Sequence, residues 1–151
     1  MSGMCGSGGV AYSSERHDWE TPQDFFDALN DEFGFDLDAA ASAENAKCRE
    51  FFDEEADGLS SDWGGRTVWC NPPYGRQIGR WVAKAAAEAR KPGTTVVLLV
   101  PARTDTRWFH DHLYGKAELR FVRGRLRFGG SDWNAPFPSM VAVLGERKEE
   151  R

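Results

Sequence analysis

Apolar residues recur at helical spacing in two stretches of the second half of the chain. From residue 78 they fall at i, i+3, i+4, i+7, i+8 and i+11, which predicts an amphipathic helix that ends before Pro92-Gly93. This is the most regular stripe in the sequence. A weaker stripe predicts a short helix over residues 106–113.

A further helix, over residues 22–33, is predicted by its end signals as well as by its apolar positions. Thr21 suits the N-cap, Pro22 suits the first helical position, and Gly34 suits the end of the helix. Its apolar face consists of Phe25, Phe26, Leu29 and Phe33.

Runs of apolar and β-branched residues predict the strands. Buried strands are expected at residues 67–70 and 94–100, and a last strand at residues 140–144. Because these strands alternate with helices, the sequence predicts a single α/β domain with a mainly parallel sheet. Weaker patterns predict short strands at residues 35–41 and 47–53, a turn at Asp57-Gly58, and a strand pair or long hairpin edge at residues 118–128.

The length of 151 residues suits one domain with its own hydrophobic core. Residues 1–14 are rich in Gly and Ser and are expected to form a flexible leader, followed by the domain over residues 15–147 and a charged tail over residues 148–151. No run of about 20 apolar residues and no signal peptide is evident. We therefore expect a soluble, cytoplasmic protein.

The cysteine and histidine positions argue against a disulfide framework or a metal site. Cys5, Cys48 and Cys70 are odd in number and far apart. His110 and His112 form a His-x-His pair, but no second cluster of ligand residues accompanies it. We expect reduced cysteines and no bound metal.

Charge is distributed unevenly along the chain. Its net value is −5, but residues 1–70 carry 16 acidic and 4 basic side chains, whereas residues 71–151 carry 8 acidic and 15 basic ones. Seven of the basic residues lie between Pro101 and Arg127. This stretch suits contact with phosphate groups, and the alternative is an ordinary solvated surface.

The segment Asn71-Pro72-Pro73-Tyr74 follows a predicted buried strand, where an α/β sheet usually binds its ligands. The Asn71 amide oxygen and the Pro72 carbonyl can accept hydrogen bonds from an exocyclic amine, while the Tyr74 ring stacks on a planar base. A base in a duplex must be flipped out to reach such a site. The alternative is a rigid turn with Tyr74 packed on the surface.

An ordered set of motifs around this segment resembles the phage-type DNA N-6-adenine methyltransferases, a family related to the Dam enzymes. The resemblance covers nearly all of residues 18–145. Its blocks are Trp19-x-Thr21-Pro22, residues 35–42 with Asn45, Asp57-Gly58-Leu59 with Trp63, Asn71-Pro72-Pro73-Tyr74, residues 99–103 and residues 123–128.

The resemblance implies a small Rossmann-like methyltransferase fold that uses S-adenosylmethionine to methylate the N6 amine of adenine in DNA. It implies that Asn71, Pro72, Pro73 and Tyr74 form the catalytic motif. The family also suggests a phage or prophage origin, a bacterial or archaeal host cell, and a role in restriction-modification, namely protection against restriction. The residues implied to bind the cofactor are Trp19, Thr21, Pro22, Asp38, Ala39, Ala40, Asp57 and Leu59.

Purely structural roles remain open for three of these residues. Asp38 can cap a helix or a sheet edge, Asp57 can simply form a turn, and Trp19 can belong to the core. The chain also departs from the common methyltransferase pattern, because Ala39-Ala40-Ala41 stands where a glycine-rich loop usually follows the first strand.

No separate target-recognition domain fits into this length, so loops are expected to contact DNA. The candidates for phosphate or base contact are Arg103, Thr104, Arg107, Arg125 and Arg127. Two alternatives stay open. One is a methyltransferase for another amine, such as cytosine N4, an RNA adenine or a protein glutamine; the other is a non-catalytic nucleic-acid-binding module with the same fold.

Overall fold

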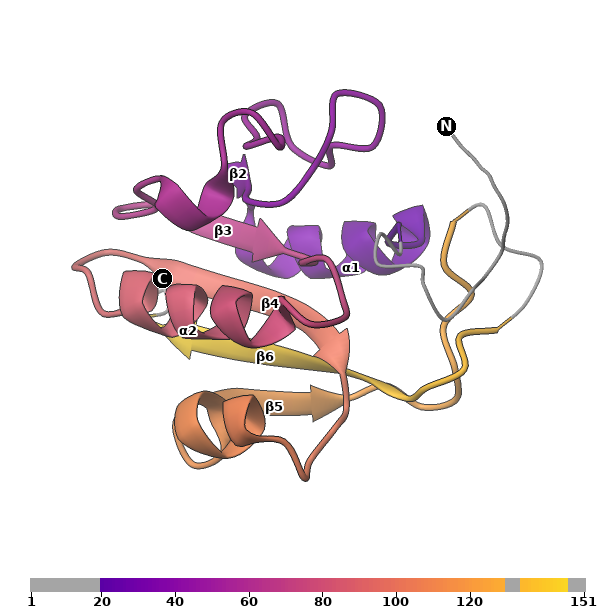
Figure 1. Ribbon diagram of the computed structural model, residues 1–151. Coiled ribbons are helices and arrows are strands. Elements are labelled where there is room, and N and C mark those ends of the chain that lie inside the picture. Colours follow the sequence, from indigo (N-terminus) through magenta and orange to yellow (C-terminus); the bar gives the residue numbers. More distant parts are fainter. Residues whose placement is uncertain (1–19, 130–133, 147–151) are drawn as a thin grey trace.

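A five-stranded sheet in the order β2-β3-β4-β6-β5 forms the centre of the protein (Figure 1). The computed structural model describes residues 20–129 and 134–146. The strands are β2 (Leu37–Asp38), β3 (Thr67–Cys70), β4 (Thr95–Pro101), β5 (Glu118–Phe121) and β6 (Ser139–Gly145). The helices are α1 (Gln23–Phe33), α2 (Ile78–Ala89), the 3-10 turn η2 (Gly58–Ser60) and the π-type turn η3 (Phe109–Leu113).

Four of the five strands run in the same direction. β2, β3 and β4 are parallel neighbours, whereas β6 is antiparallel to both β4 and β5. The predicted α/β class is confirmed, but the sheet is mixed, because two of its four pairings are antiparallel. The carboxyl ends of β2, β3, β4 and β5 consequently share one edge of the sheet, on the right of Figure 1.

Helices cover the two faces of the sheet. α2 lies in front of β4 and β6 in Figure 1, while α1 lies behind β3. On the α1 side, the Phe26 ring packs edge-on against Trp69 of β3, with ring centroids 5.4 Å apart. All residues of β3 and β4 are buried, as their unbroken apolar runs predict.

The strongest sequence patterns give the right elements. β3 and β4 lie where strands are predicted, α2 follows its apolar stripe, and β6 includes the predicted last strand. Gly34 ends α1 in a left-handed conformation, at φ 70°, and its N–H donates to the Asn30 carbonyl. The sequence signals for these elements are local, so each element can be predicted from its own residues alone.

The predicted start of α1 is wrong by one residue. Pro22 is the N-cap, because its carbonyl accepts the first helical hydrogen bond from the Phe26 N–H. Thr21 does not cap the helix; its hydroxyl instead accepts a hydrogen bond from Asn71, 50 residues away. A tertiary contact has therefore replaced the local capping role.

Three weaker predictions also need correction. Residues 47–53 form no strand, although Phe51 makes an isolated bridge with Asp38. β2 has two residues instead of the predicted seven. The predicted hairpin edge is only the strand β5, which ends at Phe121, and residues 122–128 are irregular.

Some predictions concern parts of the chain outside the described residues. These are the leader over residues 1–14, the tail over residues 148–151 and the role of Trp19. Within residues 20–129 and 134–146, no helix has the length and apolar character that a membrane crossing requires.

Candidate functional site

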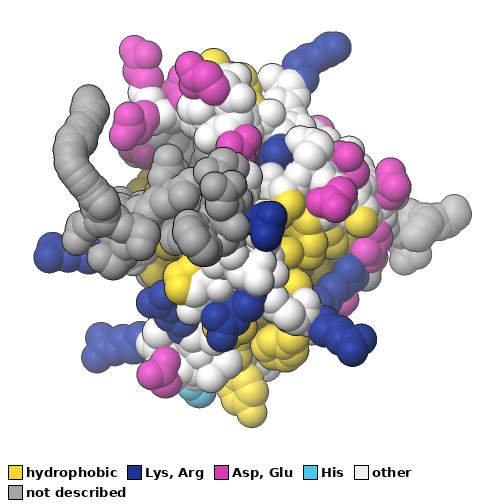
Figure 2. Space-filling view, turned by 90° about the vertical axis from the view of Figure 1, so that its right-hand side faces the viewer, with side chains coloured by type: hydrophobic (Ala, Val, Ile, Leu, Met, Phe, Trp, Pro, Cys, Tyr) yellow, Lys and Arg dark blue, Asp and Glu magenta, His cyan; other side chains and the backbone are white. Residues whose placement is uncertain are grey.

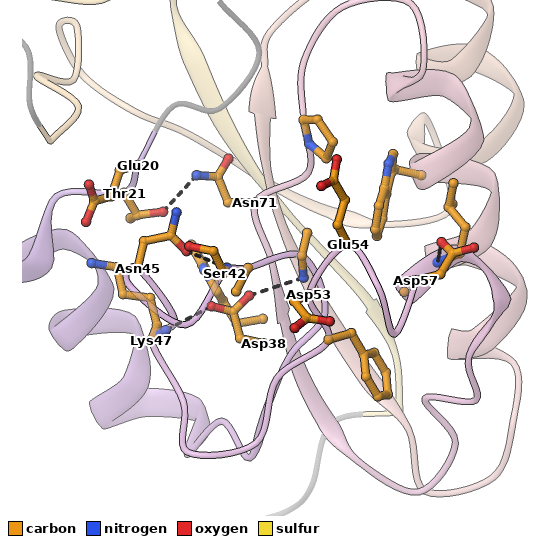
Figure 3. Close-up of a pocket in the computed structure, with 18 of the residues that line it drawn as sticks. Glu20, Thr21, Asp38, Ser42, Asn45, Lys47, Asp53, Glu54, Asp57 and Asn71 are labelled. Atoms are coloured by element: carbon orange, nitrogen blue, oxygen red, sulfur yellow. Dashed lines mark hydrogen bonds between the residues drawn. The ribbon is translucent and has the colours of Figure 1, made fainter. Parts of the chain in front are cut away.

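A cleft with a volume of about 1730 Å³ opens at the carboxyl edge of the sheet, beside the ends of β2 and β3. Its walls come from the segment before α1, the loop after β2, the acidic stretch before η2, and the residues after β3 (Figure 3). Small-molecule sites typically occupy about 300–1,000 Å³. The cleft is therefore larger than a typical site for one small molecule.

Asp38, the last residue of β2, lies at the base of this cleft and is only 3% exposed. Its carboxylate accepts hydrogen bonds from the backbone N–H groups of Lys47, at 2.9 Å, and Ala40, at 3.3 Å. Burial raises the pKa of Asp38 to about 6, even though these two hydrogen bonds and the nearby Lys47 charge lower it. A cationic ligand group beside this carboxylate would relieve the cost of burying its charge.

The loop after β2 is closed by side-chain oxygens instead of by glycines. Ala39 is buried, Ala40 is half-buried, and the Ser42 N–H donates to the Asn45 side chain at 2.8 Å. Together with the two bonds to Asp38, this contact shapes residues 40–47 around the carboxylate (Figure 3). The alanine-rich segment thus forms an ordered wall of the cleft.

Asp57 and Leu59 line the opposite end of the cleft. The Asp57 carboxylate accepts bonds from the Leu59 N–H, at 3.2 Å, and the Ser60 hydroxyl, at 2.7 Å, so it caps η2. Gly58 between them is required by close packing, because a Cβ there would lie 2.2 Å from the Ala39 carbonyl oxygen. Asp57 itself is exposed and Leu59 half-buried.

Asn71 leaves the end of β3 beside Asp38, which ends the neighbouring strand β2. Its side-chain NH2 donates a hydrogen bond of 3.0 Å to the Thr21 hydroxyl. This bond orients the amide so that its oxygen points away from Thr21 (Figure 3). The structure thereby brings Thr21, Asp38 and Asn71 into one cleft.

Pro72 and Tyr74 are buried, whereas Pro73 is half-buried like Asn71. Pro73 lines the cleft, whereas Pro72 is buried outside the lining. The Tyr74 hydroxyl donates to the Leu99 carbonyl at 2.9 Å, and its ring packs edge-on against Phe137, with ring centroids 5.6 Å apart. Burial raises the pKa of Tyr74 well above its usual value. The tyrosine is thus part of the core as well as of the cleft wall.

Acidic side chains dominate the cleft. Seven aspartates and glutamates line it, against Lys47 and Arg76. Figure 2, which faces the carboxyl edge of the sheet, shows acidic side chains mostly in its upper part and basic ones in its lower half, with apolar surface between them. The cleft therefore favours a cation, and the surface beside it favours an anion.

None of the predicted DNA-contacting residues lines the cleft. Arg103, Thr104, Arg107, Arg125 and Arg127 are all exposed, and none of them belongs to the cleft lining. The Arg103 guanidinium lies 5.9 Å from the centroid of the Phe137 ring, which in turn contacts Tyr74. Of the other residues implied by the resemblance, Pro22 and Ala39 lie outside the lining, and Ala40 belongs to it.

Several lining residues were not singled out from the sequence. Phe52 and Trp81 contribute the apolar walls, and Asp53 and Glu54 contribute part of the acidic lining. Trp81 occupies an apolar position of α2, so its pattern indicates only a core residue. The acidic run over residues 53–57 was a visible signal, because it stands just before the Asp57-Gly58 turn. Among the described residues, no three His, Cys, Asp or Glu side chains gather into a group that suits a metal ion.

Comparison with known proteins identifies a family and several relatives. The family described as DNA N-6-adenine-methyltransferase (Dam) matches residues 10–149. A DNA N-6-adenine-methyltransferase of Escherichia phage T1 is 36% identical over 110 residues, which are 72% of this chain and 45% of that protein. A protein of the same name from Haemophilus phage HP1 (strain HP1c1) is 35% identical over 111 residues, covering 72% of this chain and 64% of the relative. The chain thus spans between about half and two thirds of the length of these two relatives.

Proposed function

The chain belongs to the DNA N-6-adenine-methyltransferase (Dam) family, and on this premise we propose that it methylates the N6 amine of adenine in DNA, with S-adenosylmethionine as methyl donor. One observation carries the proposal: Asp38 and Asn71, at the ends of adjacent parallel strands, line the same cleft. The fold we propose is a reduced Rossmann-like methyltransferase domain, and the three parallel strands β2, β3 and β4 support it.

The carboxylate groups of the cleft suit S-adenosylmethionine. This cofactor carries an ammonium group and a sulfonium centre, and its sulfonium supplies an electrophilic methyl group when bound. Asp38 would accept hydrogen bonds from the ammonium group, which compensates for the burial of its carboxylate. The acidic lining adds a general preference for a cation.

The adenine ring of the cofactor would meet the other end of the cleft. Leu59, Phe52 and Trp81 supply apolar contacts there. Asp57 lies at the same end, and a carboxylate can accept a hydrogen bond from an adenine amine. Since both of its oxygens already accept bonds within η2, it would use a remaining lone pair.

The target amine would bind at the end of β3. Asn71 lines the cleft, and its side-chain oxygen would accept one of the two N–H groups. The Pro72 carbonyl, from the residue just behind the lining, would accept the other, and the two bonds would draw the nitrogen lone pair out of conjugation with the base. Tyr74 provides an aromatic edge or face for the base. Positioning and hydrogen bonding supply the rate in this scheme, so no strong general base is required.

DNA would approach from the basic part of the face in Figure 2. Phosphates would bind to the exposed residues Arg103, Thr104, Arg107, Arg125 and Arg127, while the acidic cleft would repel the backbone and admit only a flipped base. This division of charge favours nucleic acid over a protein glutamine as the substrate.

The proposal is tested by incubating the protein with labelled S-adenosylmethionine and either unmethylated plasmid DNA or RNA, then separating the nucleosides by mass spectrometry. We expect N6-methyladenine in DNA. Methylcytosine, methylated RNA or no product would contradict the proposal and favour one of the alternatives. Asn71→Ala should lower the rate by at least about a hundredfold, the usual effect of losing one preorganised hydrogen-bonding group at a reacting centre.

A thermal-shift titration separates a catalytic protein from a non-catalytic module. A ligand that binds only the folded state raises the melting temperature, by an amount that grows with its concentration. We expect a shift with S-adenosylmethionine for both the wild type and Asn71→Ala. The absence of any shift would support the non-catalytic alternative.

A further inference from the structure

The Thr21 hydroxyl and the Asn71 amide are joined by a hydrogen bond of 3.0 Å between segments 50 residues apart. From this contact we propose that Thr21 is a positioning residue: it holds the Asn71 amide in the orientation that lets the amide oxygen accept from the target amine. The inference rests on the proposed function, in which Asn71 binds that amine. It assigns to Thr21 a role different from the cofactor contact implied by the sequence resemblance.

Thr21 is well suited to this role because its own position is fixed on both sides. On one side, the Pro22 carbonyl begins α1 by accepting from the Phe26 N–H. On the other side, the Glu20 carbonyl accepts a hydrogen bond of 2.7 Å from the Gly129 N–H, and these two residues form an isolated antiparallel bridge. The Thr21 side chain is 3% exposed. A hydroxyl held in this way offers the Asn71 NH2 an acceptor with little freedom to move.

The chemistry of an amide gives this bond a direct consequence for its oxygen. An asparagine side chain has a donor end and an acceptor end, and only the acceptor end is useful toward a target NH2 group. When the NH2 of Asn71 donates to Thr21, the oxygen is left to face away from Thr21. Donation through the NH2 also polarises the amide and strengthens its oxygen as an acceptor.

The side chains of Asn71 and Tyr74 are both supported by residues 128–129. Gly129 anchors Glu20 and hence the neighbouring Thr21, whose hydroxyl holds Asn71. Phe128 packs edge-on against Tyr74, with ring centroids 6.4 Å apart. Residues from other parts of the chain thus hold Asn71 and Tyr74 in place, and a preorganised reacting group needs this kind of support.

Three variants test the role of the hydroxyl. Thr21→Val keeps the shape of the side chain and removes its acceptor, whereas Thr21→Ser keeps the acceptor. Thr94→Val is a matched control, because the buried Thr94 hydroxyl also accepts an N–H bond, from Gly65 at 2.8 Å, but lies at the opposite edge of the sheet. Melting temperature and circular dichroism of each variant establish that it is folded.

Single-turnover and steady-state methylation assays supply the decisive readout. We expect Thr21→Val to lower kcat about threefold to tenfold, the rate effect of one hydrogen bond, with KM for S-adenosylmethionine unchanged. Thr21→Ser should restore kcat to within about twofold of the wild type, and Thr94→Val should leave kcat unchanged while lowering the melting temperature. An unchanged kcat in Thr21→Val, or an increase confined to KM for the cofactor, would overturn the inference.

A measurement independent of activity separates this inference from the proposed function. In a nitrogen-15 NMR spectrum, the Asn71 side-chain NH2 is identified by its loss in Asn71→Ala. We expect its proton signals to shift and to exchange faster with water in Thr21→Val but not in Thr94→Val. If the wild type has no methylation activity, the proposed function fails whatever this spectrum shows. If the wild type is active and the Asn71 signals are the same in Thr21→Val, the positioning role fails alone.

Discussion

The Tyr74 hydroxyl donates a hydrogen bond of 2.9 Å to the carbonyl oxygen of Leu99, in the middle of the neighbouring strand β4. The hydroxyl of Tyr74, the tyrosine of the proposed catalytic segment, is therefore bonded to the core of the sheet. Phe137 and Phe128 both pack edge-on against that ring. Its position beside the cleft is a property of the folded core, and no ligand is needed to create it.

Tyr74→Phe should separate the structural part of this residue from its part in binding the base. The ring remains, but the bond to Leu99 is lost, so we expect the free energy of unfolding to fall by about 1 kcal/mol. Methylation should stay within about threefold of the wild type, because stacking does not need the hydroxyl. Urea unfolding and the methylation assay measure the two effects, with the exposed Tyr114→Phe as control. A hundredfold loss of activity would instead place the hydroxyl on the substrate.

Asp38 should make the protein less stable as the pH rises through about 6. Burial raises the pKa of its carboxyl from 3.8 to about 6, so the folded protein binds this proton more tightly than the unfolded chain does. This difference in proton binding adds about 3 kcal/mol to the free energy of unfolding below pH 3.8. The contribution is lost as the pH rises through 6. The Asp38→Asn variant lacks this titration and should not lose stability in this way. The free energy of unfolding of the variant, minus that of the wild type, should therefore increase between pH 4 and 7.

The same titration should govern cofactor affinity. Only the ionised Asp38 attracts the ammonium group, so we expect wild-type affinity for S-adenosylmethionine to rise between about pH 5 and 7, in line with the pKa of about 6. Calorimetric titration of Asp38→Asn should give weak binding with no such rise. Asp24→Asn, which changes an exposed carboxyl in the first turn of α1, should behave like the wild type. Equal pH profiles for all three proteins would exclude Asp38 from the ammonium site.

Much of the fold could be predicted because its main elements carry their own signals. The unbroken apolar run of β4 and the stripe of α2 specify those elements within their own sequences. β2 could not be delimited in this way, because its two residues are strand only through pairing with Val68 and Trp69, about 30 positions away. The end of β5 at Phe121 likewise depends on where its partner β6 begins.

The site shows the same difference between local and distant signals. Asn71 could be placed at a ligand-binding edge because it directly follows a predicted buried strand, and ligands of an α/β sheet bind beyond the carboxyl ends of its strands. The prediction that Thr21 caps the helix is wrong because it rests on the local preference of a threonine before a proline. The actual partner of the Thr21 hydroxyl is Asn71, 50 residues further along the chain. Trp81 was missed because an apolar helical position gives no sign of whether a cleft lies beside it.

Glu88 should be a main contributor to stability away from the carboxyl edge. Its buried carboxylate accepts hydrogen bonds from the Trp63 N–H at 2.7 Å, Lys91 at 2.8 Å and Lys84 at 3.0 Å. Burial alone would raise the pKa of Glu88, but these three donors outweigh it and hold the pKa below its usual value. The stabilisation is present at neutral pH and is lost as the pH falls through this lowered pKa.

Glu88→Ala should therefore lower the free energy of unfolding at pH 7 by about 2–3 kcal/mol, since it leaves the buried Trp63 N–H without its charged acceptor. The difference from the wild type should shrink in acid. Urea unfolding at several pH values measures both, and Glu55→Ala, at an exposed position, should change stability by less than about 0.5 kcal/mol. A constant difference across the pH range would contradict the role assigned to the carboxylate charge.

Arg103 should contribute to DNA affinity through phosphate contact. Its exposed guanidinium lies over the Phe137 ring at the carboxyl edge, next to the aromatic cluster that holds Tyr74. Each phosphate contact releases condensed counterions, so the logarithm of the binding constant falls with the logarithm of salt concentration, by nearly one per contact. Arg103→Ala should make this slope shallower by about 1 and weaken binding equally for different sequences. Arg90→Ala is the control, because Arg90 ends α2 at the opposite edge of the sheet and is also exposed.

The measurement is fluorescence anisotropy of a labelled duplex at salt concentrations from about 50 to 200 mM, where phosphate contacts dominate affinity. If Arg103 reads a base, Arg103→Ala will instead lose affinity only for DNA that contains the target sequence, by about 1–3 kcal/mol. If Arg90→Ala changes the slope as much as Arg103→Ala does, the DNA does not lie at the carboxyl edge. In that case a base flipped from the duplex would not reach Asn71, because Asn71 and Asp38 line the cleft at the carboxyl edge.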